Sequence, residues 1–97
     1  MKYDDDINLG KKFDLRGRRA LVTGSARGIG RAIALGLAEY GAQVAVHGVS
    51  QSAPLESALA AVKKLSPSSF SVTGDLSDAE SPEKIAEQIK RQCPLPD

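Results

Sequence analysis

The sequence has one cysteine, one histidine, no tryptophan, and only two tyrosines and two phenylalanines among its 97 residues. A single cysteine excludes a disulfide within the chain, and since nothing indicates an oxidising compartment, we expect a cytoplasmic protein. A single histidine has no second imidazole with which to build a metal site, so we interpret His47 as a side chain at a strand end and assign it no function. The shortage of aromatic residues predicts a core of alanine, valine, isoleucine and leucine.

An excess of charge and a long apolar run are also missing. The 13 basic and 12 acidic residues give a net charge of +1, which argues against binding nucleic acid or a membrane surface by bulk charge. No stretch approaches the roughly 18 consecutive apolar residues of a membrane helix, and the acidic first residues do not resemble a secretion signal. The composition is that of a globular domain, although so short a chain buries only about 60–65% of its unfolded surface, which makes independent stability marginal.

Short apolar runs rich in β-branched residues alternate with segments of helical periodicity. The expected strands are residues 20–23, 43–47 and 70–73. The expected helices are residues 29–40, 54–64 and 81–93. Because parallel strands need crossovers of about a dozen residues, which are nearly always right-handed, this order predicts an α/β fold with a Rossmann-type doubly wound parallel sheet, here only its first β-α-β-α-β-α half.

The apolar positions of the predicted helices indicate which faces they bury. The first helix is expected to bury one stripe at intervals of four, four and three residues: Ile29, Ile33, Leu37 and Tyr40. Gly36 falls within this stripe, where its missing side chain should let the helix approach the sheet closely. We expect the first two helices on one face of the sheet, and Ile85 and Ile89 of the third helix against the other.

The loop between the first strand and the first helix carries the strongest signal. Residues 23–30 have the sequence Thr-Gly-Ser-Ala-Arg-Gly-Ile-Gly. Glycines are needed where a chain turns sharply, where backbone approaches a pyrophosphate and where a helix packs closely on a strand, and the N–H groups of the helix start then face the anion. A P-loop is excluded, because Ile29 and Gly30 stand where its second glycine and its lysine belong. A tight turn without a ligand is the alternative.

This loop closely resembles that of the short-chain dehydrogenase/reductase family. The family motif T-G-x-x-x-G-x-G is matched by Thr23, Gly24, Gly28 and Gly30, and residues 13–22 look like the family's usual entry to it. The extended branch of the family needs a glycine at the position of Arg27. The resemblance is therefore to the oxidoreductase branch.

The resemblance covers residues 13–97 and implies the N-terminal half of an NAD(P)-binding Rossmann domain. We assign that half to residues 19–97, truncated before the family's fourth strand, and interpret residues 1–18 as an exposed N-terminal lead-in. Without a fourth strand beside it, the first strand becomes an open apolar edge that favours association. We therefore expect the isolated chain to be unstable, to oligomerise through that edge, or to need a complementary fragment.

The end of the second predicted strand bears on the choice of cofactor. A free ribose 2′-hydroxyl is normally bound there by an aspartate or glutamate, but Gly48 occupies the position and no carboxylate lies within seven residues of it. A 2′-phosphate is then not repelled, and Arg27, Ser50 and Ser52 can donate hydrogen bonds to it. The sequence thus favours NADP(H) over NAD(H). A solvated loop cation at Arg27, and turn or helix-cap roles for the serines, stay open alternatives.

The resemblance also implies which residues meet the rest of the cofactor. The cofactor-binding candidates of the glycine loop are Gly24, Ser25, Arg27, Gly28, Ile29 and Gly30. After the third strand, Asp75 and Leu76 resemble the family's Asp-Val/Leu pair, in which the carboxylate accepts from the adenine amino group and the next amide contacts the ring. A turn-forming role for Asp75 is the alternative, because Ser77 and Asp78 follow it.

The family's reaction centre has no counterpart in this sequence. Family members use a Tyr-x-x-x-Lys pair as general acid/base and a serine that orients the carbonyl, but Ile7 follows Tyr3 and Val44 follows Tyr40 at that spacing. We therefore assign no catalytic residue and expect the chain to be inactive alone. One hypothesis is the cofactor-binding N-terminal portion of a short-chain NAD(P)-dependent oxidoreductase, which in complete form transfers hydride between NADP(H) and a carbonyl or alcohol as a dimer or tetramer. The other is a non-catalytic nucleotide-binding or interaction module.

Overall fold

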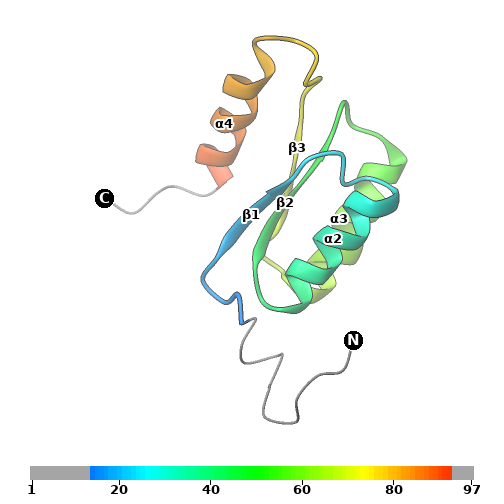
Figure 1. Cartoon of the computed structure of the whole chain (residues 1–97), viewed down its shortest axis with the longest axis vertical. Helices are drawn as coiled ribbons and strands as arrows, with labels where there is room; N and C mark the ends of the chain where they lie inside the picture. The colour runs from blue at the N-terminus through cyan, green and yellow to red at the C-terminus, as the bar shows by residue number, and fades with distance from the viewer. Residues whose placement is uncertain (1–13, 93–97) are drawn as a thin grey trace, which may run out of the picture.

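The computed structural model describes residues 14–92, which form a parallel sheet flanked by helices (Figure 1). The strands are β1 (Arg19–Val22), β2 (Gln43–Gly48) and β3 (Phe70–Thr73). The helices are α2 (Gly28–Glu39), α3 (Ala53–Leu65) and α4 (Ser81–Gln92). The strand order is β1-β2-β3 and both pairings are parallel, so the predicted Rossmann-type half is confirmed. Each strand and helix begins and ends within one residue of the predicted position.

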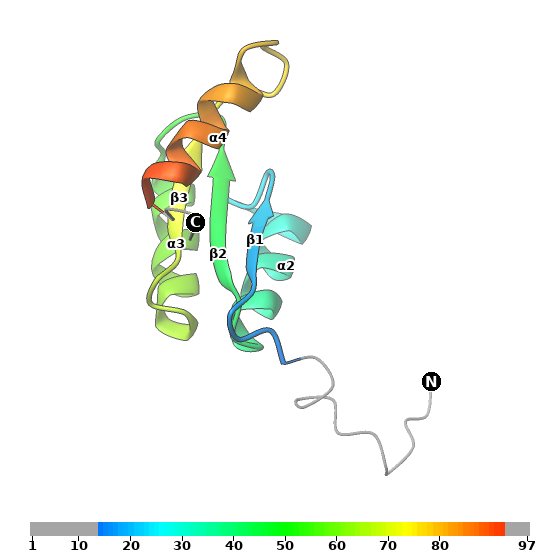
Figure 2. The same ribbon diagram turned by 90° about the vertical axis from the view of Figure 1, so that its left-hand side faces the viewer.

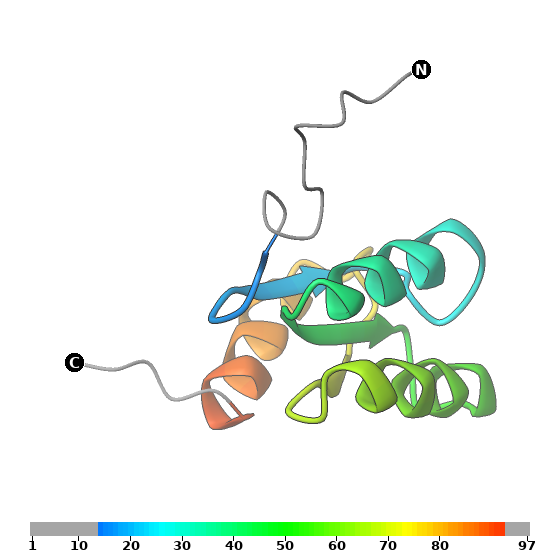
Figure 3. The ribbon, with the colours of Figure 1, turned by 90° about the horizontal axis from the view of Figure 1, so that it is seen from below.

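The helices are divided between the two faces of the sheet as predicted. α2 and α3 lie side by side on one face, whereas α4 lies on the other (Figure 1, Figure 3). Figure 2 shows α4 over β3, at the edge of the sheet far from β1. Within residues 14–92, no helix combines the length and the apolar character needed to cross a membrane.

β1 is an edge strand in the described part of the chain, because its single neighbour is β2. On the face that carries α4, a hollow of about 190 Å³ extends over β1 and β2. The hollow is lined by Arg19, Ala20, Leu21, Gln43, Ala45, Phe70 and Ile89. Within residues 14–92, the edge of β1 and the sheet face beside it are therefore both uncovered.

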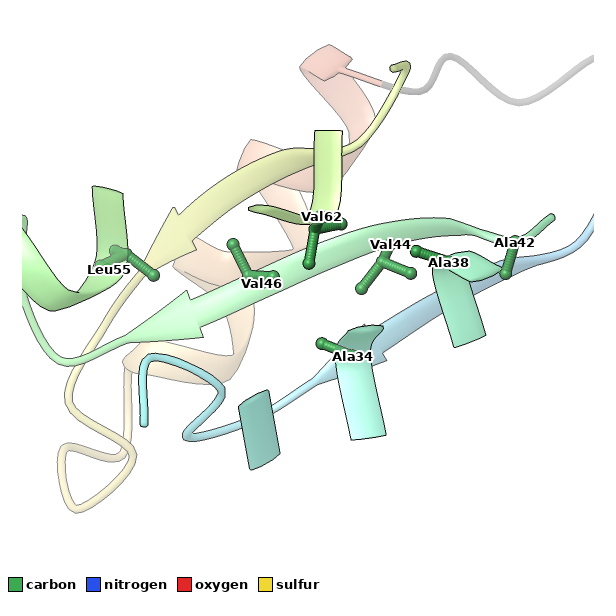
Figure 4. Close-up of a cluster of buried hydrophobic side chains, with 7 residues drawn as sticks. All are labelled: Ala34, Ala38, Ala42, Val44, Val46, Leu55 and Val62. Atoms are coloured by element: carbon green, nitrogen blue, oxygen red, sulfur yellow. The ribbon is translucent and has the colours of Figure 1, made fainter. Parts of the chain in front are cut away.

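The main core lies between the sheet and the α2–α3 layer (Figure 4). Its side chains are small or aliphatic, and all are nearly or fully buried: Ala34, Ala38, Ala42, Val44, Val46, Leu55 and Val62. The central strand β2 is buried on both faces, because Val44 and Val46 meet the two helices while Ala45 and His47 face the other side. The prediction of a core without aromatic residues is confirmed for this cluster.

The buried face of α2 differs from the predicted stripe, which was wrong by one position. Three of the four expected residues are exposed to a large extent: Ile29 by 81%, Ile33 by 50% and Tyr40 by 38%. Ala34 and Ala38 are buried instead, because α2 packs against α3 as well as the sheet and small side chains allow that approach. The close approach expected at Gly36 is also wrong, since a Cβ there would meet no atom within 4 Å.

The segment before β1 takes part in the fold at one residue. Leu15 is half-buried against the core cluster, and its N–H donates to the carbonyl oxygen of Tyr40 over 2.8 Å. Asp14 and Arg16 beside it form an exposed ion pair, whose hydrogen bonds lower the pKa of Asp14 to about 2. Residues 1–13 of the predicted exposed lead-in lie outside the described residues. Leu15 differs from the prediction, because it is half-buried.

Candidate functional site

The carboxyl ends of the three strands bring three loops to one edge of the sheet. Because the strands are parallel, residues 23–27, 49–52 and 74–80 follow them on the same side, toward which the arrowheads point in Figure 2. This is the edge at which open α/β sheets bind their ligands. Every residue predicted to bind a cofactor lies on these loops or in the first turn of α2.

The glycines of the first loop are required for two different structural reasons. Gly24 and Gly28 have φ angles of 61° and 59°, in the left-handed region that side chains disfavour. A Cβ on Gly30 would stand 2.4 Å from the carbonyl oxygen of Gly24 and 3.1 Å from Cα of Ser25. The loop therefore turns at its two ends and folds back onto the first turn of α2, where only a glycine fits.

The start of α2 presents backbone donors and no negative charge. Its N-cap residue, Arg27, is extended and supplies no side-chain cap, and no acidic residue occupies the first turn. The first helical hydrogen bond is the one from Arg31 N–H to the Arg27 carbonyl, so the amides of residues 28–30 have no partner within the helix. Together with the positive end of the helix dipole, these amides suit an anion.

Two predicted residues of the first loop differ sharply in exposure. The Arg27 side chain is exposed, and within residues 14–92 its guanidinium forms no ion pair. Ser25 is completely buried, its Oγ accepts from the His47 N–H over 2.7 Å, and its own N–H donates to the His47 carbonyl over 2.9 Å. The side chain of Arg27 is thus open to solvent, whereas the side chain of Ser25 joins the loop to β2.

His47, to which the sequence analysis gave no function, lies at the centre of this edge with 3% of its surface exposed. Its Nδ1 accepts a hydrogen bond from Gly24 N–H over 3.0 Å, and its Nε2 lies 2.7 Å from the carbonyl oxygen of Gly74. A backbone N–H can only donate and a carbonyl can only accept, so these two partners fit the tautomer that carries its proton on Nε2. The one sequence signal for this contact is the position of His47 near the end of the middle strand.

The serines after β2 occupy different surroundings. Ser50 is exposed in the turn. Ser52 is half-buried as the N-cap of α3, and its Oγ accepts from Leu55 N–H over 3.2 Å. Its helix-cap alternative is thus realised, while the hydroxyl hydrogen stays available to donate. With Gly48 ending β2, no carboxylate stands at this position of the edge.

Asp75 forms a turn at the end of β3. Its Oδ1 accepts hydrogen bonds from the hydroxyl and the backbone N–H of Ser77, over 2.7 and 2.9 Å. These two bonds lower the pKa of the exposed Asp75 carboxyl below its usual value. Its Oδ2 has no hydrogen-bond partner among residues 14–92 and is free to accept from a ligand, and Leu76 beside it is 50% exposed. The turn and the predicted adenine contact are therefore compatible.

Comparison with known proteins finds similarity over most of the chain. The family model described as short chain dehydrogenase matches residues 18–95. The L-rhamnose 1-dehydrogenase (NAD(P)(+)) of Sphingomonas sp. strain SKA58 is 39% identical over 66 residues, which are 68% of this chain and 26% of that protein. The L-rhamnose 1-dehydrogenase (NADP(+)) of Thermoplasma acidophilum is 37% identical over 76 residues, which are 78% of this chain and 30% of that protein.

A solved structure shares the fold over nearly the whole chain. The 3-oxoacyl (acyl-carrier-protein) reductase from Agrobacterium tumefaciens C58, with NADP bound, superposes with a TM-score of 0.77 and 38% identity, over 97% of this chain and 36% of that one. The chain thus spans between 26% and 36% of the length of these three proteins.

Proposed function

This chain belongs to the short-chain dehydrogenase family, and from that premise we propose that it is the dinucleotide-binding portion of an NAD(P)-dependent oxidoreductase. The observation that carries the proposal is the glycine loop. It turns at Gly24 and Gly28 and leaves the first backbone amides of α2 without partners in the helix. A Cβ on either of these glycines would meet no protein atom within 4 Å, so the space beside the loop is open to a ligand. The residues present therefore fit a pyrophosphate.

Each of the three loops takes one part of the cofactor in this proposal. The amides of Gly28, Ile29 and Gly30 bind the pyrophosphate at the positive end of α2. Asp75 accepts from the adenine amino group through Oδ2, and Leu76 lies against the ring. When bound, the nicotinamide supplies the hydride chemistry, between a carbonyl and an alcohol in the complete enzyme, while this chain orients the adenosine half.

The preferred cofactor in this proposal is NADP(H). The edge beside Gly48 offers Arg27, Ser50 and Ser52 to a 2′-phosphate and has no carboxylate to repel it. The relatives named for NADP(+) or NAD(P)(+), and the NADP-bound reductase, support use of an NAD(P) cofactor, and the preference for NADP(H) is our proposal. A cytoplasmic location and a dimer or tetramer for the complete enzyme remain our predictions.

Substitution of Arg27 tests the cofactor preference. A hydrogen bond to a charged group contributes about 1.5–3 kcal/mol, so Arg27→Ala should raise the dissociation constant for NADP+ roughly 10- to 150-fold and leave that for NAD+ nearly unchanged. Calorimetric titration of both cofactors measures this difference. Lys63→Ala is the control. Lys63 is exposed in the last turn of α3, at the end of that helix far from Ser52, so its substitution should change neither affinity. Equal losses for both cofactors with Arg27→Ala would contradict the 2′-phosphate role.

A further inference from the structure

We infer that His47 is a positioning residue that holds the phosphate loop and the adenine loop in register, so that one dinucleotide meets both. The inference rests on the proposed function and adds a residue to it. His47 itself is 3% exposed and touches no ligand in this account. It acts through Gly24, at the start of the glycine loop, and through Gly74, which directly precedes Asp75.

The ring joins two loops that no other side chain of the described residues joins through hydrogen bonds. Gly24 N–H donates to Nδ1 over 3.0 Å, and Nε2–H donates to the Gly74 carbonyl over 2.7 Å. The backbone of β2 adds bonds at the same level, because the His47 carbonyl accepts from Ser25 N–H and the Gly48 carbonyl accepts from Gly74 N–H over 3.1 Å. The strand thus fixes where each loop starts, and the imidazole fixes the distance between them.

Displacement of Gly24 is transmitted to the amides that meet the pyrophosphate. The carbonyl oxygen of Gly24 lies so close to Gly30 that a Cβ there would stand only 2.4 Å away. A shift of Gly24 would therefore change how the loop packs against the first turn of α2. Loss of the bond at Gly74 instead acts on the exposed turn that carries Asp75 and Leu76, where the Gly74 N–H bond to the Gly48 carbonyl is the backbone bond that remains to β2.

Two conservative variants separate the two bonds. In His47→Asn, the side-chain oxygen lies near the place of Nδ1 and can accept from Gly24, but its nitrogen falls short of Gly74. In His47→Gln, the terminal amide reaches the place of Nε2 and can donate to Gly74, but nothing replaces the acceptor at Nδ1. His47→Phe keeps a ring of similar size and removes both bonds.

The experiment measures dissociation constants of the full chain for three probes: NADP+, inorganic pyrophosphate and adenosine 2′,5′-bisphosphate. His47→Phe should weaken NADP+ about ten-fold, which corresponds to about 1.4 kcal/mol. Compared with His47→Phe, His47→Asn should bind pyrophosphate more tightly but not the bisphosphate. His47→Gln should bind the bisphosphate more tightly but not pyrophosphate. Ser69→Ala is the control: it removes a buried acceptor for Val44 N–H at the other end of β2, and should lower stability without changing these ratios.

The outcomes separate this inference from the proposed function. Nitrogen NMR of the imidazole should show the proton on Nε2 and Nδ1 as an acceptor, a result that does not depend on any cofactor. Failure of the unaltered chain to bind NADP+ would count against the proposed function, whereas the other tautomer would overturn the role of His47. Folded His47→Phe with unchanged NADP+ affinity would overturn it too. If His47→Phe does not fold, the asparagine and glutamine variants are compared with each other: equal affinities of the two variants for pyrophosphate and for the bisphosphate would show a packing role only and would overturn the inference.

Discussion

Replacing Gly30 with alanine tests the geometry of the glycine loop, and the chain carries its own control in Gly36. Both glycines lie in α2, and neither has a left-handed φ, so alanine is favourable for the helix at either position. They differ in their surroundings. A Cβ on Gly30 would stand 2.4 Å from the Gly24 carbonyl oxygen, a backbone atom, whereas a Cβ on Gly36 would meet nothing within 4 Å.

The expected magnitudes have opposite signs. Gly36→Ala should stabilise the fold by about 0.5–1 kcal/mol, because alanine loses less conformational entropy in a helix. Gly30→Ala gains part of the same term but forces the loop away from α2, and overpacking of this kind costs roughly 1–3 kcal/mol, which leaves a net loss of about 0.5–2.5 kcal/mol. For a domain of this size, 1 kcal/mol shifts Tm by roughly 4–8 °C, so the loss in Gly30→Ala amounts to about 2–20 °C.

Thermal unfolding followed by circular dichroism, with and without NADP+, measures both effects. The stabilisation by NADP+ should persist in Gly36→Ala and fall strongly in Gly30→Ala, because the displaced loop also moves the amides that meet the pyrophosphate. A Gly30→Ala chain that melts at or above the temperature of the unaltered chain, and is stabilised equally by NADP+, would refute the close packing of loop and helix.

Two further predictions concern Asp75 and the open edge of the sheet. Ser77→Ala removes the hydroxyl that donates to Asp75, so the pKa of Asp75 should rise toward its ordinary value of 3.8. A lowered carboxyl pKa stabilises the fold above that ordinary value, and the effect is lost as the pH falls through the lowered pKa. This contribution should therefore be smaller in the variant, and its loss should be complete at a higher pH; carbon NMR titration of the carboxyl measures the pKa, and an unchanged pKa would contradict the prediction. The uncovered edge of β1 and the hollow beside it predict self-association at micromolar concentration, which sedimentation equilibrium detects, whereas a monomer with a cooperative melt would contradict it.

The elements of the fold could be predicted closely because their ends are marked in the sequence. Ser52 and Pro54 mark the start of α3, for example, and Ser52 does cap it through Leu55 N–H. Short β-branched runs between such marks allow little other than strands. The glycine loop could be predicted for a related reason, because left-handed φ angles and a close backbone approach each leave glycine as the residue of choice.

The phase of α2 could not be predicted because periodicity identifies which residues share a face, and not where the neighbours of the helix lie. Ala34 and Ala38 are buried since α2 packs against both the sheet and α3, and the larger Ile29 and Ile33 are left at the outer side. Hydrophobicity alone favours isoleucine over alanine for burial, so the spacing pointed to the wrong stripe.

The role of His47 could not be predicted because both of its side-chain partners are distant in sequence. Gly24 lies 23 residues before it and Gly74 lies 27 residues after it, so the contact exists only once the three strands are paired. A lone histidine carries no motif that indicates such a bridge. The burial of Leu15 could not be predicted for a similar reason, because its hydrogen bond to the Tyr40 carbonyl joins residues far apart in the sequence, at the end of α2.

The central claim is that the glycine loop of this chain binds the pyrophosphate of a dinucleotide cofactor. The most direct test is a titration of the nitrogen-labelled chain with NADP+, followed by the backbone amide signals in NMR. If the loop binds the pyrophosphate, saturable shifts are expected at Gly24, Gly28, Ile29 and Gly30, together with Asp75 and Leu76 on the neighbouring loop. Saturable shifts confined to other parts of the chain, or the absence of any shift in a folded chain, would contradict it.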